Sequence, residues 1–252
     1  MKVARRLTLD YVAHSVVGPR SRNEDRWLAQ EIGGSDWLGV FAVADGLGGH
    51  GGGELASQLA INELEAAIGR LPGCDETQLD LLMKETFKKI GSALRARQNE
   101  GKRPDLSHMG TTLSVLTVRH DVAYIHYVGD SRVYLWRQSD LRRLTEDHTV
   151  GFRLWKEGAL TRAQYLQSPM RDRLYRYLGG SEQCIGKVRF PVKPNDFLFV
   201  VSDGTQSLGW QLQLANNSKH EGLLTRTVAD WFSRESCAQL EDNATMIAVH
   251  LS

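Results

Sequence analysis

Apolar runs bordered by an aspartate recur four times along the chain, and no other feature constrains the fold as much. The four aspartates are Asp45 in FAVADG, Asp130 in YVGDS, Asp203 in FVVSDG and Asp242 in EDN, just before TMIAV. A single Asp-Gly after a strand is an ordinary turn. If the four strands share a sandwich, however, their ends gather carboxylates at one rim, where the charges repel. Oxygen ligands without Cys or His favour Mg²⁺ or Mn²⁺ over Zn²⁺.

Hydrophobic periodicity predicts an α+β fold in one domain, residues 1–252. Apolar residues alternate from Leu7 to Ala13, which predicts a strand, and spacing typical of helices predicts helices over 54–70 and 77–98. Residues 146–180 mix short helical pieces with Ser-Pro and Gly-Gly, which indicates an insertion over the sheets. Further strands are predicted over 38–44, 111–119, 123–128, 133–137, 197–201 and 245–251.

Charge and composition argue against several functional classes. Thirty-one Lys and Arg against 30 Asp and Glu give a net charge of +1, which provides no broad cationic field for nucleic acid or anionic lipid. The longest apolar stretches, such as 197–201, are far shorter than the ~20 residues of a membrane span. Three widely spaced cysteines indicate neither a disulfide framework nor a zinc site. We therefore expect a cytoplasmic protein that binds neither nucleic acid nor membrane.

Seven motifs in a fixed order carry a resemblance to a known family. They are R-x-x-x-E-D (20–25), VADGLGGHGGGELAS (43–57), MGTTLSV (109–115), YVGDSRVYL (127–135), LTEDHT (144–149), VVSDG (200–204) and EDNATMI (241–247). Together they resemble the metal-dependent serine/threonine protein phosphatases of type 2C, and the bacterial branch most closely. The resemblance implies a four-layer α-β-β-α sandwich, with two central antiparallel sheets flanked by helix pairs and a flap over about 146–180.

The resemblance also implies roles for individual residues. Asp45 matches the carboxylate that bridges two Mn²⁺ or Mg²⁺ ions, the Gly46 carbonyl matches a ligand of the second ion, and Asp203 and Asp242 match ligands of the first. Glu24 and Asp25 match acidic residues that hold metal-bound water, and Arg20 matches the residue that binds substrate phosphate. A planar guanidinium suits phosphate oxygens independently of the family. Asp130 matches a ligand of a weaker third ion, although Asp is equally typical of a tight turn.

The implied reaction is hydrolysis of phosphoserine and phosphothreonine in proteins by a metal-activated water, reversing a bacterial serine/threonine kinase. We expect the protein to act as a monomer. Leu47 occupies the position where many eukaryotic relatives have a histidine, so the resemblance does not identify the proton donor to the leaving group. His50 is more typical of a structural hydrogen-bonding residue in a Gly-rich turn.

In the basic segment 151–180, Arg171 and Arg173 are candidates for binding acidic phosphopeptides, or else part of a solvated face.

Two other functional classes remain. A binding module without catalysis on the same fold is one, although such a protein should have lost metal ligands and every matched acidic position is intact. A metal-dependent hydrolase of nucleotides or nucleic acid is the other. The cysteine chemistry of tyrosine phosphatases is disfavoured, because no cysteine is followed six positions later by an arginine.

Overall fold

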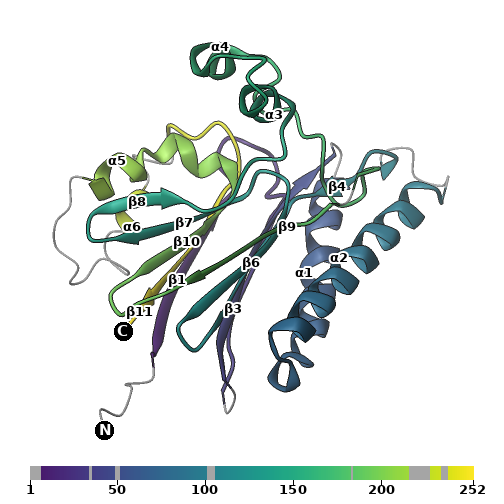
Figure 1. Ribbon diagram of the computed structural model, residues 1–252. Coiled ribbons are helices and arrows are strands. Elements are labelled where there is room, and N and C mark those ends of the chain that lie inside the picture. Colours follow the sequence, from purple (N-terminus) through teal and green to yellow (C-terminus); the bar gives the residue numbers. More distant parts are fainter. Residues whose placement is uncertain are drawn as a thin grey trace, which may run out of the picture.

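Two antiparallel sheets lie face to face in the computed structural model, which describes residues 7–33, 36–48, 52–100, 106–182, 184–215, 228–233 and 238–252 (Figure 1). Sheet A has the strand order β1-β11-β10-β7-β8, with bounds Leu9–Val16, Ala244–Leu251, Phe197–Val201, Arg132–Arg137 and Asp140–Arg143. Sheet B has the order β2-β3-β5-β6-β9, with bounds Asp25–Glu31, Trp37–Leu47, Leu113–Arg119, Val122–Val128 and Gly186–Pro191. The short strand β4 (Gly110–Thr111) also pairs with β3.

Strand β3 shows why the central strands appear as continuous apolar runs. Phe41 and Val43 point into the core between the two sheets, whereas Val40, Ala42 and Ala44 belong to the core beneath the helices. All five side chains are fully buried. A strand covered on both faces has no polar side, so alternation disappears from its sequence.

Helices α1 (Gly52–Ile68) and α2 (Glu76–Gln98) cover the outer face of sheet B, and the 3₁₀ helix η1 (Leu71–Gly73) lies between them in the chain (Figure 1). At the start of α2, Gln78 N donates to Asp75 Oδ1 at 2.8 Å and Asp75 N donates to Gln78 Oε1 at 2.8 Å. This reciprocal cap satisfies two backbone donors that a helix start leaves free. The helices predicted over 54–70 and 77–98 are therefore confirmed.

Short helices α5 (Trp210–Ala215) and α6 (Val228–Trp231) cover the outer face of sheet A (Figure 1). Trp210 and Trp231 are buried there, with ring centroids 5.7 Å apart, and both pack on Phe199 of β10. Helices thus flank both sheets, and the predicted α-β-β-α sandwich is confirmed.

Three strands were absent from the sequence prediction, and all three are sheet edges: β2, β8 and β9. On β9, Lys187 Nζ pairs with Asp80 at 2.6 Å and Arg189 Nε pairs with Glu76 at 2.7 Å, both on α2. Edge strands carry such charged residues because they are only partly covered and must avoid pairing with other chains. The charges interrupt the apolar pattern that revealed the central strands.

The predicted insertion, residues 146–180, lies beyond one end of the sheets and carries α3 (Val150–Lys156) and α4 (Arg162–Gln167) (Figure 1). The hydroxyls of Thr149 and Thr161 cap these two helices. Trp155 and Tyr165 stack at 5.5 Å between ring centroids, which joins α3 to α4. Among the described residues, no helix combines the length and apolar character that a membrane crossing requires.

Candidate functional site

Two of the predicted acidic residues face each other directly. Asp25, the first residue of β2, is the antiparallel partner of Asp45 near the end of β3. Asp25 is 2% exposed; its Oδ2 accepts a hydrogen bond from Ser202 Oγ at 2.8 Å, and its Oδ1 is buried with no hydrogen-bond partner among the residues that the structure describes. Like charges directly opposite on a sheet are destabilising. This pair therefore costs stability unless a proton or a cation offsets the charge.

The backbone of Asp45 is held by two threonines of the MGTT motif. Thr112 N and Thr111 Oγ1 both donate to the Asp45 carbonyl at 2.9 Å, and Asp45 N donates to Thr112 Oγ1 at 3.0 Å. Thr112 also shares a hydrogen bond with Ser131 at 2.7 Å, next to Asp130. The MGTT motif thus connects the backbone of Asp45 with the segment that carries Asp130.

Gly46 allows three segments to meet beside Asp45. A Cβ at Gly46 would clash with the carbonyl of Gly53 at the start of α1, and it would lie 2.7 Å from the carbonyl oxygen of Glu24. A Cβ at Gly53 would lie 2.8 Å from the Glu24 carboxylate. Gly46 and Gly53 therefore serve close backbone approach, as glycine typically does next to a ligand or another chain segment.

Three further aspartates lie around this pair at the same end of the sandwich. Asp130 follows β6, Asp203 follows β10, and Asp242 precedes β11. Burial raises the pKa of Asp45 well above its usual value, and the charges of Asp25, Asp203, Asp130 and Asp242 raise it further. The four predicted runs do bring their carboxylates together.

Asp25, Asp203, Glu24 and Asp130 also have raised pKa values. Burial raises the pKa of Asp25 from 3.8 to about 7, against hydrogen bonds from Thr245 and Ser202. Burial likewise raises the pKa of Asp203, of Glu24 and, strongly, of Asp130. Negative charge in a poorly solvated place is unfavourable. These shifts show that the site would gain from positive charge.

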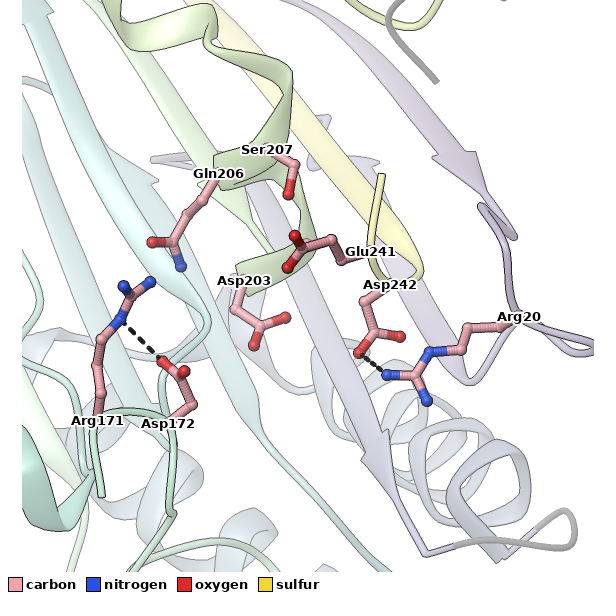
Figure 2. Close-up of a pocket in the computed structure, with 9 residues that line it drawn as sticks. Arg20, Arg171, Asp172, Asp203, Gln206, Ser207, Glu241 and Asp242 are labelled. Atoms are coloured by element: carbon pink, nitrogen blue, oxygen red, sulfur yellow. Dashed lines mark hydrogen bonds and ion pairs between the residues drawn. The ribbon is translucent and has the colours of Figure 1, made fainter. Parts of the chain in front are cut away.

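An open pocket at this rim is lined by acidic and basic side chains from distant parts of the chain. Its lining residues are Arg20, Arg171, Asp172, Asp203, Gly204, Gln206, Ser207, Glu241 and Asp242. Figure 2 shows Arg171 and Asp172 on one side, Arg20 with Asp242 on the other, and Asp203 between them. Gln206 and Ser207 come from the 3₁₀ helix η3 (Asp203–Leu208).

Two arginines in the pocket are paired with carboxylates. Arg20 NH2 lies 2.7 Å from Asp242 Oδ2, and Arg171 Nε lies 3.3 Å from Asp172 Oδ1 (Figure 2). The Arg20 and Asp242 side chains are 58% and 42% exposed, so this pair holds the arginine only weakly. Arg173 is exposed and does not line the pocket; its NH1 contacts Met170 Sδ at 3.7 Å.

A buried ion pair connects the carboxylate rim to the 146–180 segment. Arg132, two residues after Asp130, binds Asp147 through Nε to Oδ1 at 2.9 Å and NH2 to Oδ2 at 2.7 Å. Arg143 NH1 reaches the same Oδ2 at 3.0 Å, and its guanidinium lies 4.8 Å from the ring centre of Phe152 on α3. Arg132 also lowers the pKa of Asp130, in opposition to burial.

His148 has a structural position beside this ion pair. Its Nδ1 accepts a hydrogen bond from Gly129 N at 3.1 Å, and its ring stacks on Tyr127 at 5.1 Å. Burial, together with the charge of Arg176, lowers its pKa to about 4. His148 is therefore neutral near pH 7. The other histidine considered from the sequence, His50, lies outside the described residues.

The donor set fits a hard divalent cation in its chemistry. Its members are carboxylate and carbonyl oxygens, Asp25 Oδ1 is buried without a partner, and the pKa shifts show that the cluster lacks positive charge. The geometry is not preformed, since within the described ranges no three Asp, Glu, His or Cys side chains are arranged to hold a metal ion. Arg20 currently occupies one oxygen of Asp242.

Several residues that hold this site together were not identified from the sequence as site residues: Asn243, Ser202, Thr112, Arg132 and Asp147. Each lies within or next to one of the quoted motifs. The only sequence feature that marked them was a polar or charged residue type within one of these motifs. Their contacts reach across the fold, so the sequence did not show what they bind.

Comparison with known proteins identifies relatives over most of the chain. A profile of the protein phosphatase 2C family matches residues 14–243. The serine/threonine protein phosphatase PstP of Mycobacterium tuberculosis is 36% identical over 200 residues, which is 79% of this chain but only 36% of that protein. The serine/threonine phosphatase stp of Listeria monocytogenes is 28% identical over 236 residues, covering 91% of this chain and 90% of the relative.

Solved structures share the same fold. The serine/threonine phosphatase of S. agalactiae superposes with a TM-score of 0.86 at 22% identity, over 96% of this chain and 99% of the other. The catalytic domain of PstP in complex with two manganese ions gives a TM-score of 0.76 at 27% identity, over 97% and 99% of the two chains. The sheets and helices described above are thus those of these phosphatases.

Proposed function

Because the chain belongs to the protein phosphatase 2C family, we propose that it hydrolyses phosphoserine and phosphothreonine monoesters in proteins with the help of Mn²⁺ or Mg²⁺. The observation that carries this proposal is the convergence of five aspartates, Asp25, Asp45, Asp130, Asp203 and Asp242, beside a pocket that also contains Arg20. An anionic phosphate would not enter such an acidic pocket unless cations were present to bind it.

We assign the cation ligands from this geometry and the family pattern. Asp45 would bridge two ions, the Gly46 carbonyl would complete one of them, and Asp203 and Asp242 would bind the other. Glu24 and Asp25 would hold water on the ions. The resemblance to PstP with two manganese ions supports this assignment, and the unpartnered Asp25 Oδ1 gives it independent support. Asp130 with Asp203 would hold a weaker third ion.

When bound, the two ions would lower the pKa of a water molecule and neutralise charge on the phosphoryl oxygens. Arg20, at the edge of the pocket, would leave Asp242 and bind the substrate phosphate through its planar guanidinium. Leu47 has no proton to donate, so the leaving oxygen would take its proton from solvent in the open pocket. Asp45, Asp203 and Asp242 would present their carboxylates at this rim from positions at or next to the ends of β3, β10 and β11.

Phosphate release from three substrates tests this function. A phosphothreonine peptide, a nucleotide and a single-stranded oligonucleotide are each incubated with the protein and Mn²⁺, with and without excess chelator. We expect release from the peptide alone and no release in chelator. Release mainly from the nucleotide or oligonucleotide would favour another phosphoester hydrolase, whereas no release from any substrate would favour a binding module.

Further proposals concern the opposing kinase, the oligomeric state and the compartment of the protein. Such phosphoesters are made by protein kinases, so we propose that the chain opposes a bacterial serine/threonine kinase as a monomeric, cytoplasmic enzyme. Cys74 and Cys184, the two cysteines within the described ranges, are both unpaired, which supports a reducing compartment. Size-exclusion chromatography with light scattering tests the monomer, and co-expression with the kinase tests the pairing through the kinase's phosphorylation state.

Arg171 is proposed to bind acidic residues that flank the phosphosite. It lies in the pocket lining on the 146–180 segment, across from Arg20 (Figure 2). We expect Arg171→Ala to raise KM for an acidic phosphothreonine peptide by about fivefold at low salt, since a partly screened charge contributes about 1 kcal/mol. Turnover of p-nitrophenyl phosphate should change less than about twofold, because that substrate has no flanking charge.

Arg173→Ala provides the matched control for this prediction, because Arg173 carries the same charge two residues away but lies outside the pocket lining. Its effect on KM should be smaller than that of Arg171→Ala. Equal losses with both substrates would indicate a folding or metal defect. Equal effects of the two variants would assign the preference to the overall charge of the segment.

A further inference from the structure

The side chain of Asn243 connects two segments of the pocket that are far apart in sequence. Asn243 Nδ2 donates to the carbonyl oxygens of Val17 at 2.7 Å and Arg22 at 2.9 Å, and Asn243 Oδ1 accepts from Glu24 N at 2.8 Å. All the hydrogen-bonding groups of this amide except one lone pair are thus used on the backbone of a single loop, residues 17–24. We call residues 17–24 the Arg20 loop.

The contact is enclosed and tightly packed. Asn243 is 5% exposed, whereas the Arg20 side chain is 58% exposed. Gly18 has φ +60°, and a Cβ there would clash with the carbonyl of Asp242. The loop therefore lies directly against the residues that precede β11. A buried amide with three hydrogen bonds is costly to replace, because the partners would be left unsatisfied.

The contact of the Arg20 side chain with the rim is weak compared with the hydrogen bonds that Asn243 makes to the loop backbone. Its ion pair with Asp242 joins two half-exposed side chains, and such pairs contribute ~0–1 kcal/mol. The same ion pair must break for Arg20 to bind phosphate. What stays in place is the backbone of the Arg20 loop, which Asn243 holds next to Asp242; Asn243 N also donates to Asp242 Oδ1 at 2.8 Å.

We propose that Asn243 is a positioning residue that holds the Arg20 loop so that the guanidinium of Arg20 meets the substrate phosphate beside Asp242. This role rests on the proposed function, in which Arg20 binds phosphate. Asn243 itself is not among the residues that line the pocket. Its amide acts on the reaction only through the loop, which makes the role separable from those of the carboxylates.

Asn243→Asp is the main test variant, because aspartate has nearly the same shape and can still accept from Glu24 N but cannot donate to Val17 and Arg22. Asn243→Ala removes all three hydrogen bonds and serves as the second variant. Asn62→Asp controls for the added charge: Asn62 is exposed on α1, and its side chain accepts a hydrogen bond from Gln58 Nε2 at 2.8 Å, which aspartate can also accept. Asn62→Asp should behave like the parent protein.

Hydrogen–deuterium exchange of the intact protein measures the anchoring itself. In both Asn243 variants, a peptide covering residues 17–28 should exchange about tenfold faster or more, while amides of β6 stay unchanged, since local opening follows the loss of local contacts. Unchanged exchange in 17–28 would overturn the proposal. The measurement needs no activity, so it remains decisive even if the chain hydrolyses no phosphoprotein.

A double-mutant cycle with Arg20→Ala measures the functional consequence. Asn243→Asp should lower kcat/KM for the phosphothreonine peptide about tenfold and weaken inhibition by inorganic phosphate to a similar extent. In the Arg20→Ala background the same substitution should change both values less than about twofold, because residues that act through one another are not additive. Equal effects in the two backgrounds would overturn the role through Arg20, even if the exchange result held.

Discussion

Asp45→Asn should reduce Mn²⁺-dependent phosphate release by about 10³-fold or more, the scale of losing a group that organises charge in an active site. Asp45 is half-buried and faces Asp25 across the β2–β3 pair, and poor solvation together with its acidic neighbours raises its pKa. Asparagine keeps the shape but removes the charge that would attract both ions. The comparable Asp203→Asn and Asp242→Asn variants should each lose activity on the same scale.

The same substitution should raise stability in the absence of metal. Poor solvation and repulsion from Asp25 make the ionised form of Asp45 unfavourable. Removing the charge relieves both. We expect a higher melting temperature for Asp45→Asn than for the parent protein in chelator at pH 8. Asp36→Asn is the control, since the Asp36 side chain is 56% exposed and pairs with Arg119 on the surface. Full parental activity in excess chelator, or a less stable Asp45→Asn, would contradict this account of the site.

The metal-free protein should lose stability as the pH rises from about 4 to about 7. Burial raises the pKa of Asp25 from 3.8 to about 7, so the folded state binds its proton more tightly than the unfolded chain does. The stabilisation from that proton is complete below pH 4 and disappears as the pH passes 7. A shift of this size corresponds to about 4 kcal/mol of unfolding free energy.

Urea unfolding in chelator at several pH values measures this effect. The difference between the parent and Asp25→Asn isolates Asp25, since all other groups titrate in both proteins. We expect the variant to gain stability relative to the parent between pH 4 and 7, whereas Asp36→Asn should show no such trend. A parent stability that stays level over this range relative to Asp25→Asn would mean that Asp25 is ionised at no cost in the folded protein.

The central elements were predictable because their residues repeat a local period. Strands such as β3 and β10 appear as compact apolar runs, and the spacing of Leu79, Met83, Ile90 and Leu94 predicts α2. The edge strands β2, β8 and β9 were not predicted. On β9 the charges of Lys187 and Arg189 are satisfied by α2, a contact that sequence periodicity does not show.

The candidate site was predictable in its residues but not in its connections. Asp45, Asp130, Asp203 and Asp242 stood out because each borders an apolar run, and the motif order assigned their roles. The structure places Arg171 at the pocket but Arg173 outside its lining, although the two are equivalent in a basic sequence segment. Which of two neighbouring arginines points into a pocket depends on how the segment packs.

The sequence by itself determined which side chains are available for the chemistry and which segments become the buried strands and helices, because burial and periodicity are local properties of the chain. Only the tertiary structure decided which of those side chains meet. Asp25 faces Asp45 through strand register, Arg20 reaches Asp242 across 222 positions, and Asn243 reaches Val17 across 226. Such contacts depend on how the two sheets pack and on which strands are neighbours, and no local pattern of residues specifies that geometry.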